Sequence, residues 1–217
     1  MIKDIRSLIF GGFTGNCYLI ETDRGFVLID TGRKSVRSKL VQELTDAGCV
    51  PENLNLIILT HGDFDHTGNC VYLREKYDVK IAMHQYDSGM VEFGDMFWNK
   101  KSGNLIIKKL INRFFNITKF KPDHLIDEES DLSEYGLDAQ VLHLPGHSKG
   151  SIGILTASGD FFCGDLFTNT KKPEPNSMVD DLNEFNESII KIQELNIEVV
   201  YPGHGQPFSM NLYRNSN

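Results

Sequence analysis

Residues 54–66 read LNLIILTHGDFDH and predict a metal-binding loop between a strand and a helix. The apolar run Leu54 to Leu59 is typical of a short buried strand, and a helix is predicted to begin near His66. Between them lie His61, Asp63 and Asp65, so that with His66 two histidines and two aspartates fall within six residues. Imidazole and carboxylate groups at such positions converge as ligands for Zn, Fe or Mn.

Three further polar signals each follow a predicted strand. They are His147 after 139–144, Asp165 after 160–163 and His204 after 197–201. Taken singly, a histidine after a strand is usually a surface residue, and a Gly-Asp pair is usually a turn. Loops at strand ends are, however, where open α/β folds place their ligands. Four such signals after four strands therefore favour one shared site.

The rest of the chain predicts an α/β fold of two mixed β-sheets flanked by helices. Predicted strands that lack a site residue cover 17–21, 26–29, 79–83 and 151–156, and predicted helices cover 35–47, about 66–76 and 181–195. The first two strands form a hairpin, because the turn Thr22 to Gly25 separates them. At 217 residues, the chain is expected to be a single domain, 1–217.

An aromatic-rich stretch around 88–121 differs from the surrounding pattern and predicts a helical insertion. Phe93, Met96, Phe97 and Trp98 stand here among Lys and Asn residues. They could form a wall of a substrate pocket. The alternatives left open are core packing of the inserted helix and a contact between two copies of the chain in a homodimer.

Composition narrows the class of partner. A net charge of −8 lacks the basic excess expected of a nucleic-acid-binding protein. The four cysteines are scattered, which is typical of reduced thiols in the cytoplasm rather than of a disulfide framework. No signal peptide and no apolar run of roughly 20 residues is seen. We therefore expect a cytoplasmic enzyme with a small-molecule substrate and no membrane partner.

The order of these motifs resembles the metallo-β-lactamase superfamily. That family carries an H-x-H-x-D-H cluster, a later His, a bridging Asp and a final His, and the turn Asp30-Thr31-Gly32 is also similar. The resemblance implies an αββα sandwich with two divalent metal ions (Zn, Fe or Mn) at the sheet edges. The implied ligands are His61, Asp63 and His147 for one ion, Asp65, His66 and His204 for the other, and Asp165 between them. Asp30 would support the metal loop from outside the ligands; an ordinary turn residue is the alternative.

Position 63 departs from the family pattern, because this chain reads H-x-D-x-D-H. An aspartate can still bind a metal, and a glutamate occupies this place in the related flavodiiron proteins. Two divalent ions against Asp63, Asp65 and Asp165 leave a charge of about +1, one unit below the histidine form. We expect such a centre to prefer Fe or Mn over Zn. The alternative is that Asp63 does not bind and only one ion is held.

The resemblance implies a dinuclear metal-dependent hydrolase acting on a small ester, thioester, lactone or phosphoester. The ions would lower the pKa of a bridging water to give hydroxide, and Asp65 would be the catalytic proton shuttle. The alternative is a di-iron redox enzyme of flavodiiron type that reduces oxygen or nitric oxide. It would need a separate electron-donor protein, since the chain leaves no room for a flavin domain.

Overall fold

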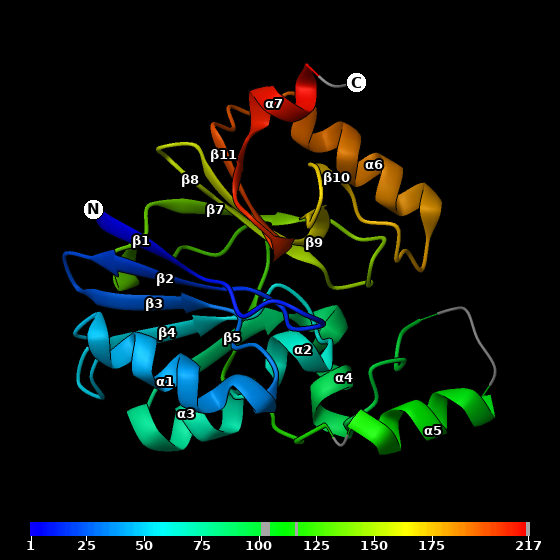
Figure 1. Ribbon diagram of the computed structural model, residues 1–217, viewed down its shortest axis with the longest axis horizontal. Helices are drawn as coiled ribbons and strands as arrows, with labels where there is room; N and C mark the ends of the chain where they lie inside the picture. The colour runs from blue at the N-terminus through cyan, green and yellow to red at the C-terminus, as the bar shows by residue number, and fades with distance from the viewer. Residues whose placement is uncertain (101–104, 116, 216–217) are drawn as a thin grey trace.

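Two β-sheets pack face to face in the computed structural model, and helices cover their outer faces (Figure 1). The structure describes residues 1–100, 105–115 and 117–215. This αββα arrangement confirms the predicted fold class. Within the described ranges, no helix has the length and apolar character needed to cross a membrane.

The first sheet combines an antiparallel half with a parallel half. Its strands, in spatial order, are β1 (Ile2–Leu8), β2 (Cys17–Thr22), β3 (Gly25–Ile29), β4 (Leu54–Ile58), β5 (Lys80–His84) and β6 (His124–Ile126). Strands β1 to β3 pair antiparallel, and β3 to β6 pair parallel. Parallel pairing requires crossover connections, and these contain α1 (Arg37–Asp46), α3 (Cys70–Tyr77) and α4 (Gln85–Phe93). The parallel strands therefore end at the same edge of the sheet.

The second sheet has the order β12 (Phe208–Ser209), β11 (Val199–Gly205), β9 (Asp160–Asn169), β8 (Ile152–Thr156) and β7 (Ala139–His143), with β10 (Glu174–Pro175) paired to β9. Strands β9 and β11 run parallel, and α6 (Leu182–Gln193) lies between β10 and β11 in the chain. In Figure 1, α6 and α7 (Met210–Arg214) lie on the opposite side of the molecule from α1 and α3. The remaining helices are α2 (Phe64–Thr67), α5 (Leu105–Phe115) and the short 3-10 turns Lys34–Val36 and Ser133–Tyr135.

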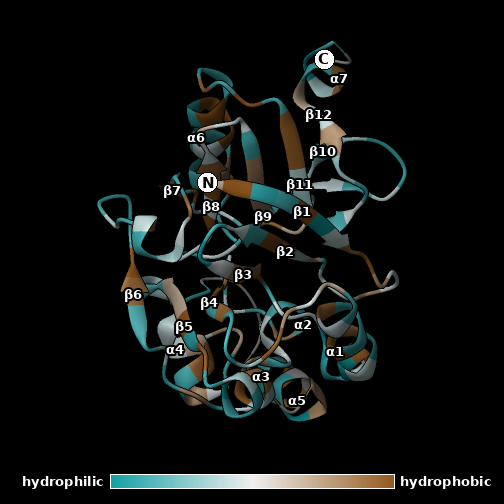
Figure 2. Ribbon diagram, turned by 90° about the vertical axis from the view of Figure 1, so that its left-hand side faces the viewer, coloured by the Kyte–Doolittle hydropathy of each residue, from teal (hydrophilic) through white to brown (hydrophobic). Residues whose placement is uncertain are grey.

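Alternating side chains divide the core into layers, because successive residues of a strand face opposite sides of its sheet. On β2, Tyr18 and Ile20 join the cluster between the two sheets, whereas Leu19 joins the cluster beneath the helices. On β9, Phe162 faces the first sheet and Phe161 faces α6. In Figure 2 brown, hydrophobic segments accordingly alternate with teal and white ones along the strands.

Two predicted strands continue further than expected. The runs 160–163 and 197–201 belong to β9 and β11, which extend to Asn169 and Gly205. Asp165 and His204 therefore lie within strands rather than after their ends, and that expectation was wrong. The parallel ladder continues past register shifts around Pro202, which the hydrophobic pattern does not reveal.

The region beyond β4 also differs from the expected helices. The helix predicted over 66–76 is two helices, α2 and α3, with Gly68 between them. The Gly68 amide donates to the Gly32 carbonyl at 2.9 Å, which ties the break to the loop after β3. The stretch around 88–121 starts inside α4, whose Met90 and Val91 are fully buried, and continues into α5, whose Phe114 is 81% exposed. Its described residues therefore alternate between buried and exposed, since Phe93 and Trp98 are also exposed.

The interface between the sheets predicts a large stability effect at Phe162. This ring is fully buried and lies against Tyr201 and Tyr18, with centroids 4.7 and 5.4 Å away. Phe162→Ala should lower the free energy of unfolding by about 3–5 kcal/mol, measured by denaturant titration. Phe13→Ala, at a ring that is 85% exposed, should change it by less than about 0.5 kcal/mol. Equal losses in the two variants would contradict this description of the core.

Candidate metal centre

Seven histidine and aspartate side chains from four segments meet at one edge of the sandwich. They come from the β4–α2 loop and α2, the β7–β8 loop, β9 and β11: His61, Asp63, Asp65, His66, His147, Asp165 and His204. The structure brings together every residue for which the sequence predicted a ligand role. Within this set, three groups of three place one potential ligand atom each within 4.8 Å of the others.

The first group is His61, Asp63 and His147, all buried. Asp63 Oδ2 lies 3.1 Å from His147 Nε2 and 3.7 Å from His61 Nε2. Two imidazole nitrogens and one carboxylate oxygen therefore face one point. This is the set that the family pattern implies for one ion.

The second group is Asp65, His66 and His204. Asp65 Oδ2 lies 3.5 Å from His204 Nε2 and 3.9 Å from His66 Nε2. This group is more open on one side, because Asp65 and His204 are only partly buried. The exposed side is where a substrate could approach.

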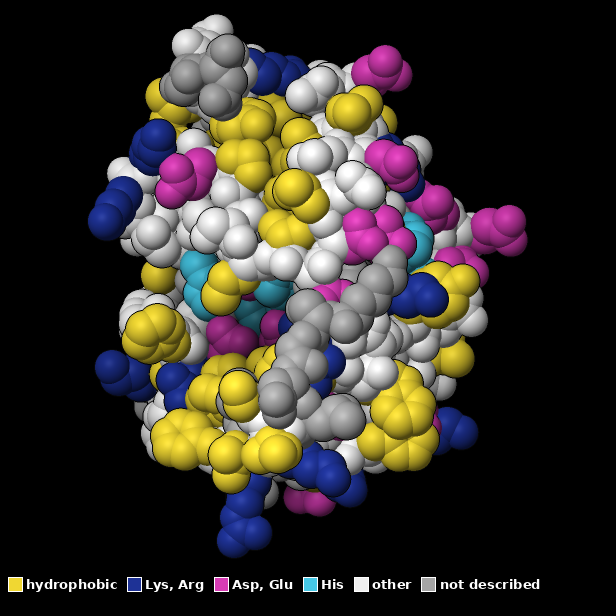
Figure 3. Space-filling model, turned by 90° about the vertical axis from the view of Figure 1, so that its right-hand side faces the viewer, with side chains coloured by type: hydrophobic (Ala, Val, Ile, Leu, Met, Phe, Trp, Pro, Cys, Tyr) yellow, Lys and Arg dark blue, Asp and Glu magenta, His cyan; other side chains and the backbone are white. Residues whose placement is uncertain are grey.

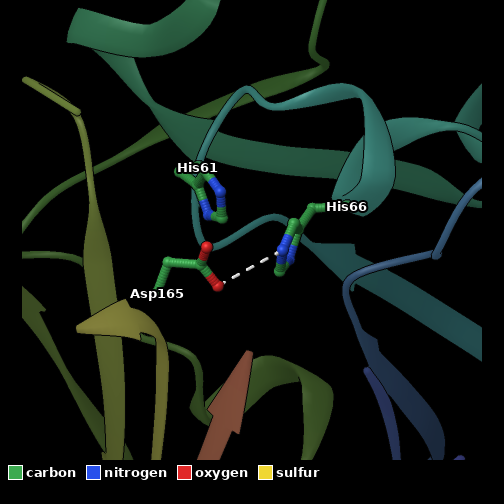
Figure 4. A group of neighbouring side chains, drawn as sticks. All are labelled: His61, His66 and Asp165. Carbon is green, nitrogen blue, oxygen red and sulfur yellow. Dashed lines mark ion pairs between the residues drawn. The ribbon is translucent and has the colours of Figure 1, made fainter. Parts of the chain in front are cut away.

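Asp165 lies between the two groups. Its Oδ1 is 3.4 Å from His66 Nε2 and 3.5 Å from His204 Nε2, whereas its Oδ2 is 3.8 Å from His147 Nε2. Figure 4 shows Asp165 and His66 pointing toward one another beside His61. Each carboxylate oxygen of Asp165 thus faces a different group, which is the geometry that a bridging ligand requires.

Hydrogen bonds to Asp30 orient two of the histidines. Asp30 accepts from the Thr60 amide (2.8 Å), from Thr60 Oγ1 (2.7 Å) and from His66 Nδ1 (2.8 Å). The single Thr60 hydroxyl hydrogen is used toward Asp30, so Thr60 Oγ1 accepts from His61 Nδ1 at 3.0 Å. Both rings therefore carry their hydrogen on Nδ1 and direct Nε2 toward the centre.

Backbone groups complete the outer support. His147 Nδ1 donates to the Met178 carbonyl at 2.6 Å, which leaves its Nε2 facing the centre as well. The His204 segment is held from the other end of the chain, because Asn16 Nδ2 donates to the Pro202 carbonyl and Tyr18 Oη donates to the same oxygen at 2.6 Å.

Two further residues help to hold the centre in place. The sequence did not indicate either of them. Asp87 is fully buried and accepts from the Gly62 amide, Ser148 Oγ and the Gly150 amide, so it joins the His61 loop to the His147 loop. Lys100 places Nζ 2.9 and 3.1 Å from the two oxygens of Asp63. Neither position carries a motif, since both contacts are made only in the folded chain.

The pKa values of two buried histidines, His61 and His66, are shifted in opposite directions. Burial lowers the pKa of His61 well below its ordinary value, so this ring is neutral. Burial would also lower the pKa of His66, but the surrounding carboxylates, Asp30 first, hold it well above the ordinary range. Burial would raise the pKa of Asp63, but the charge of Lys100 together with the His147 and His61 imidazoles outweighs burial and lowers it. For Asp65 burial prevails, and the pKa of this carboxyl is raised.

Buried atoms without partners show that the residues fit a metal pair. His61 Nε2, His66 Nε2 and Asp165 Oδ1 are buried and have no hydrogen-bond partner among the described residues. Such groups are costly unless something binds them. The backbone also leaves no room to spare here, because a Cβ on Gly15 would lie 2.6 Å from the His66 ring. Nitrogen and oxygen donors of this kind suit Zn, Fe and Mn.

The face of the molecule that carries the centre is mixed in character. Histidine and acidic side chains gather there beside a group of hydrophobic side chains (Figure 3). A cavity of about 300 Å³ lies next to Phe64, the residue between Asp63 and Asp65. The Phe64 ring stacks on Phe115 of α5 at 3.8 Å, and the Arg33 guanidinium lies 5.2 Å over Phe64. Part of the stretch around 88–121 therefore borders a cavity.

Comparison with known proteins gives consistent matches. The family model of the metallo-beta-lactamase superfamily matches residues 10–204. Probable metallo-hydrolase YqgX of Bacillus subtilis is 28% identical over 71% of this chain, and hydroxyacylglutathione hydrolase GloC of Haemophilus influenzae is 29% identical over 66%. The matches span 66% and 61% of those two relatives. The crystal structure of TTHA1623 in a di-iron-bound form is 28% identical, has a TM-score of 0.74, and each chain covers 98% of the other.

The close approach of Gly203 to Asp165 gives a test of the centre. A Cβ at Gly203 would collide with Asp165 Oδ1. Gly203→Ala should therefore displace Asp165 and weaken metal retention by about 10- to 100-fold, measured by metal analysis after dialysis against a chelator. Gly48→Ala is the control away from the centre: its Cβ would meet nothing within 4 Å, and the strain of its positive φ of 79° should affect stability but not metal retention. Unchanged metal retention in Gly203→Ala would exclude Asp165 from the centre.

Proposed function

The chain belongs to the metallo-beta-lactamase superfamily, and we propose that it is a hydrolase that holds two divalent metal ions. The observation that carries this proposal is the pair of ligand groups with Asp165 between them, one carboxylate oxygen facing each. His61, Asp63 and His147 would hold one ion, and Asp65, His66 and His204 the other.

The chemistry divides between the ions and the protein. When bound, the ions would supply Lewis acidity and a water acidic enough to act as a nucleophile near neutral pH. Asp65 would be placed to hold the proton that this water would release, because its Oδ2 faces the second group. Asp30, Thr60 and the Met178 carbonyl keep the imidazoles in the orientation that this reaction needs.

Iron or manganese is the proposed metal. Three of the seven donors are carboxylates, and oxygen donors favour these harder ions over zinc. The di-iron form of the similar TTHA1623 structure supports the same assignment. Stoichiometric zinc as the sole metal, in protein purified without added metal, would contradict it.

A thioester with an anionic remainder is the proposed substrate. The relative GloC is named a hydroxyacylglutathione hydrolase, and acylglutathiones are thioesters that carry carboxylates. The cavity beside Phe64 is lined by Arg33, whose guanidinium suits a carboxylate or phosphate, and by the stacked rings of Phe64 and Phe115. Phe64 and Thr67, which flank the proposed ligands Asp65 and His66 in the chain, are part of the lining of this cavity.

The ligand assignment predicts severe losses on truncation. Asp63→Ala and His147→Ala should each lower kcat/KM by about 100-fold or more, together with the content of the first ion. Activity is measured on thioesters, esters, lactones and phosphodiesters after loading with Fe, Mn or Zn. Near-normal turnover in either variant would contradict the assignment. Oxygen uptake with a reductant, in the absence of hydrolysis, would point instead to the di-iron redox function.

The cavity predicts a separate effect on substrate binding. Arg33→Met should raise KM for an anionic thioester by about tenfold while kcat stays unchanged, because the remote charge is bound equally in ground and transition states. A neutral thioester should show no change. Lys39→Met removes an exposed charge on α1 and is the control. An equal effect of Arg33→Met on both substrates would exclude this cavity as the anion site.

A further inference from the structure

Asp63 forms a buried ion pair with Lys100. The two side chains are 11% and 12% exposed, and Lys100 Nζ lies within hydrogen-bond distance of both carboxylate oxygens. Long charged side chains are rarely buried to this extent unless they are paired. The contact therefore belongs to the interior of the site rather than to a solvated surface.

The pair leaves Asp63 able to bind a metal. Its Oδ2 also faces His147 Nε2 at 3.1 Å and His61 Nε2 at 3.7 Å. A carboxylate has about four lone-pair positions, so the ammonium can occupy one on each oxygen while Oδ2 keeps one toward the imidazoles. Lys100 can thus stay paired with Asp63 while Oδ2 of Asp63 binds an ion in the ligand group.

The turn that carries Lys100 is fastened to the metal loop itself. Asn99 Nδ2 donates to Asp87 Oδ1 at 2.8 Å and also to the Tyr86 carbonyl. The other oxygen of Asp87 accepts from the Gly62 amide. Lys100 and the loop that contains Asp63 are therefore positioned by the same buried carboxylate, which fixes the spacing between them.

We propose that Asp63 and Lys100 act as one charge-neutral unit in place of a neutral second ligand of the first ion. Asp63 supplies the donor oxygen and Lys100 cancels its charge. Counted from the three carboxylates alone, the centre was expected to be one charge less positive than with a histidine at position 63. Counting Lys100 as well removes that difference. This inference rests on the proposed metal centre. In it, Lys100 is a positioning residue, because it acts on the ion through Asp63 by offsetting the charge of that carboxylate.

The competing arrangement places the ammonium where the first ion would lie. An ammonium in that position would lie against both imidazole nitrogens, whereas the hydrogen bonds of Lys100 Nζ among the described residues go to Asp63. His61 Nε2, however, is buried and has no hydrogen-bond partner among the described residues. The geometry therefore favours a lysine paired with Asp63 over a lysine in place of the ion.

A double-mutant cycle with metal retention as the readout tests the unit. The variants are Lys100→Met, Asp63→His and the combination of both, with Lys109→Met as the matched control at an exposed lysine of α5. Metal content is measured by elemental analysis, and the affinity of each ion by competition with a chelator. Thermal unfolding with and without metal reports on folding.

The expected results differ in sign. Asp63→His should weaken the first ion by about 100-fold or more, because it leaves a buried ammonium unpaired beside a cation. Lys100→Met should tighten the first ion by about tenfold, because it removes a like charge. The double variant should lie within about threefold of the native protein, and Lys109→Met should be unchanged.

Three outcomes would overturn parts of this account, and they are distinguishable. Effects that multiply without coupling would show that Lys100 and Asp63 act independently. One ion in the native protein and two in Lys100→Met would show that Lys100 stands in for an ion. No metal bound by the native protein under any loading condition would instead overturn the proposed function.

Discussion

Asp30 accepts three hydrogen bonds in the interior of the protein, and the orientation of two of the central histidines follows from them. Two come from Thr60 and one from His66. Thr60 donates its only hydroxyl hydrogen to Asp30, so its oxygen accepts from His61 Nδ1. Asp30 thereby also determines that Nε2 of His61 faces inward. Asp30 itself has a positive φ of 57°, an uncommon conformation for a residue other than glycine. Such a conformation persists at functional sites where the surrounding structure imposes it.

The sequence was sufficient where the information is local. The strand Leu54 to Leu59 and the cluster from His61 to His66 predicted both the metal loop and its place at a strand end, and the family resemblance supplied the remaining ligands. Lys100 and Asp87 could not be found in this way, because their contacts join segments separated by 37 and 25 residues without a periodic pattern. The lengths of β9 and β11 were underestimated for a related reason. Their ladder continues through register shifts that depend on the partner strand.

Lys100 offsets the negative charge that the carboxylate at position 63 adds to the centre. Considered alone, Asp63 makes the centre one charge less positive than a histidine would. With the ammonium paired to it, the donor atom is oxygen but the added charge is close to zero. Ligand type and net charge, which usually change together, are separated here. The expected preference for iron or manganese then rests on oxygen donors, and not on charge.

An early and a late segment of the chain meet beside the centre, since Asn16 and Tyr18 hold the carbonyl of Pro202 near His204. This connection orders events during synthesis. His61 to His66 leave the ribosome about 140 residues before His204, which at roughly 5–20 residues per second is a delay of about 7 to 28 seconds. Until then, the ligands from His61 to His66 lack His204 and the strand β11 that carries it. A nascent chain therefore exposes an incomplete set of ligands. The complete metal centre forms only after His204 has been synthesised.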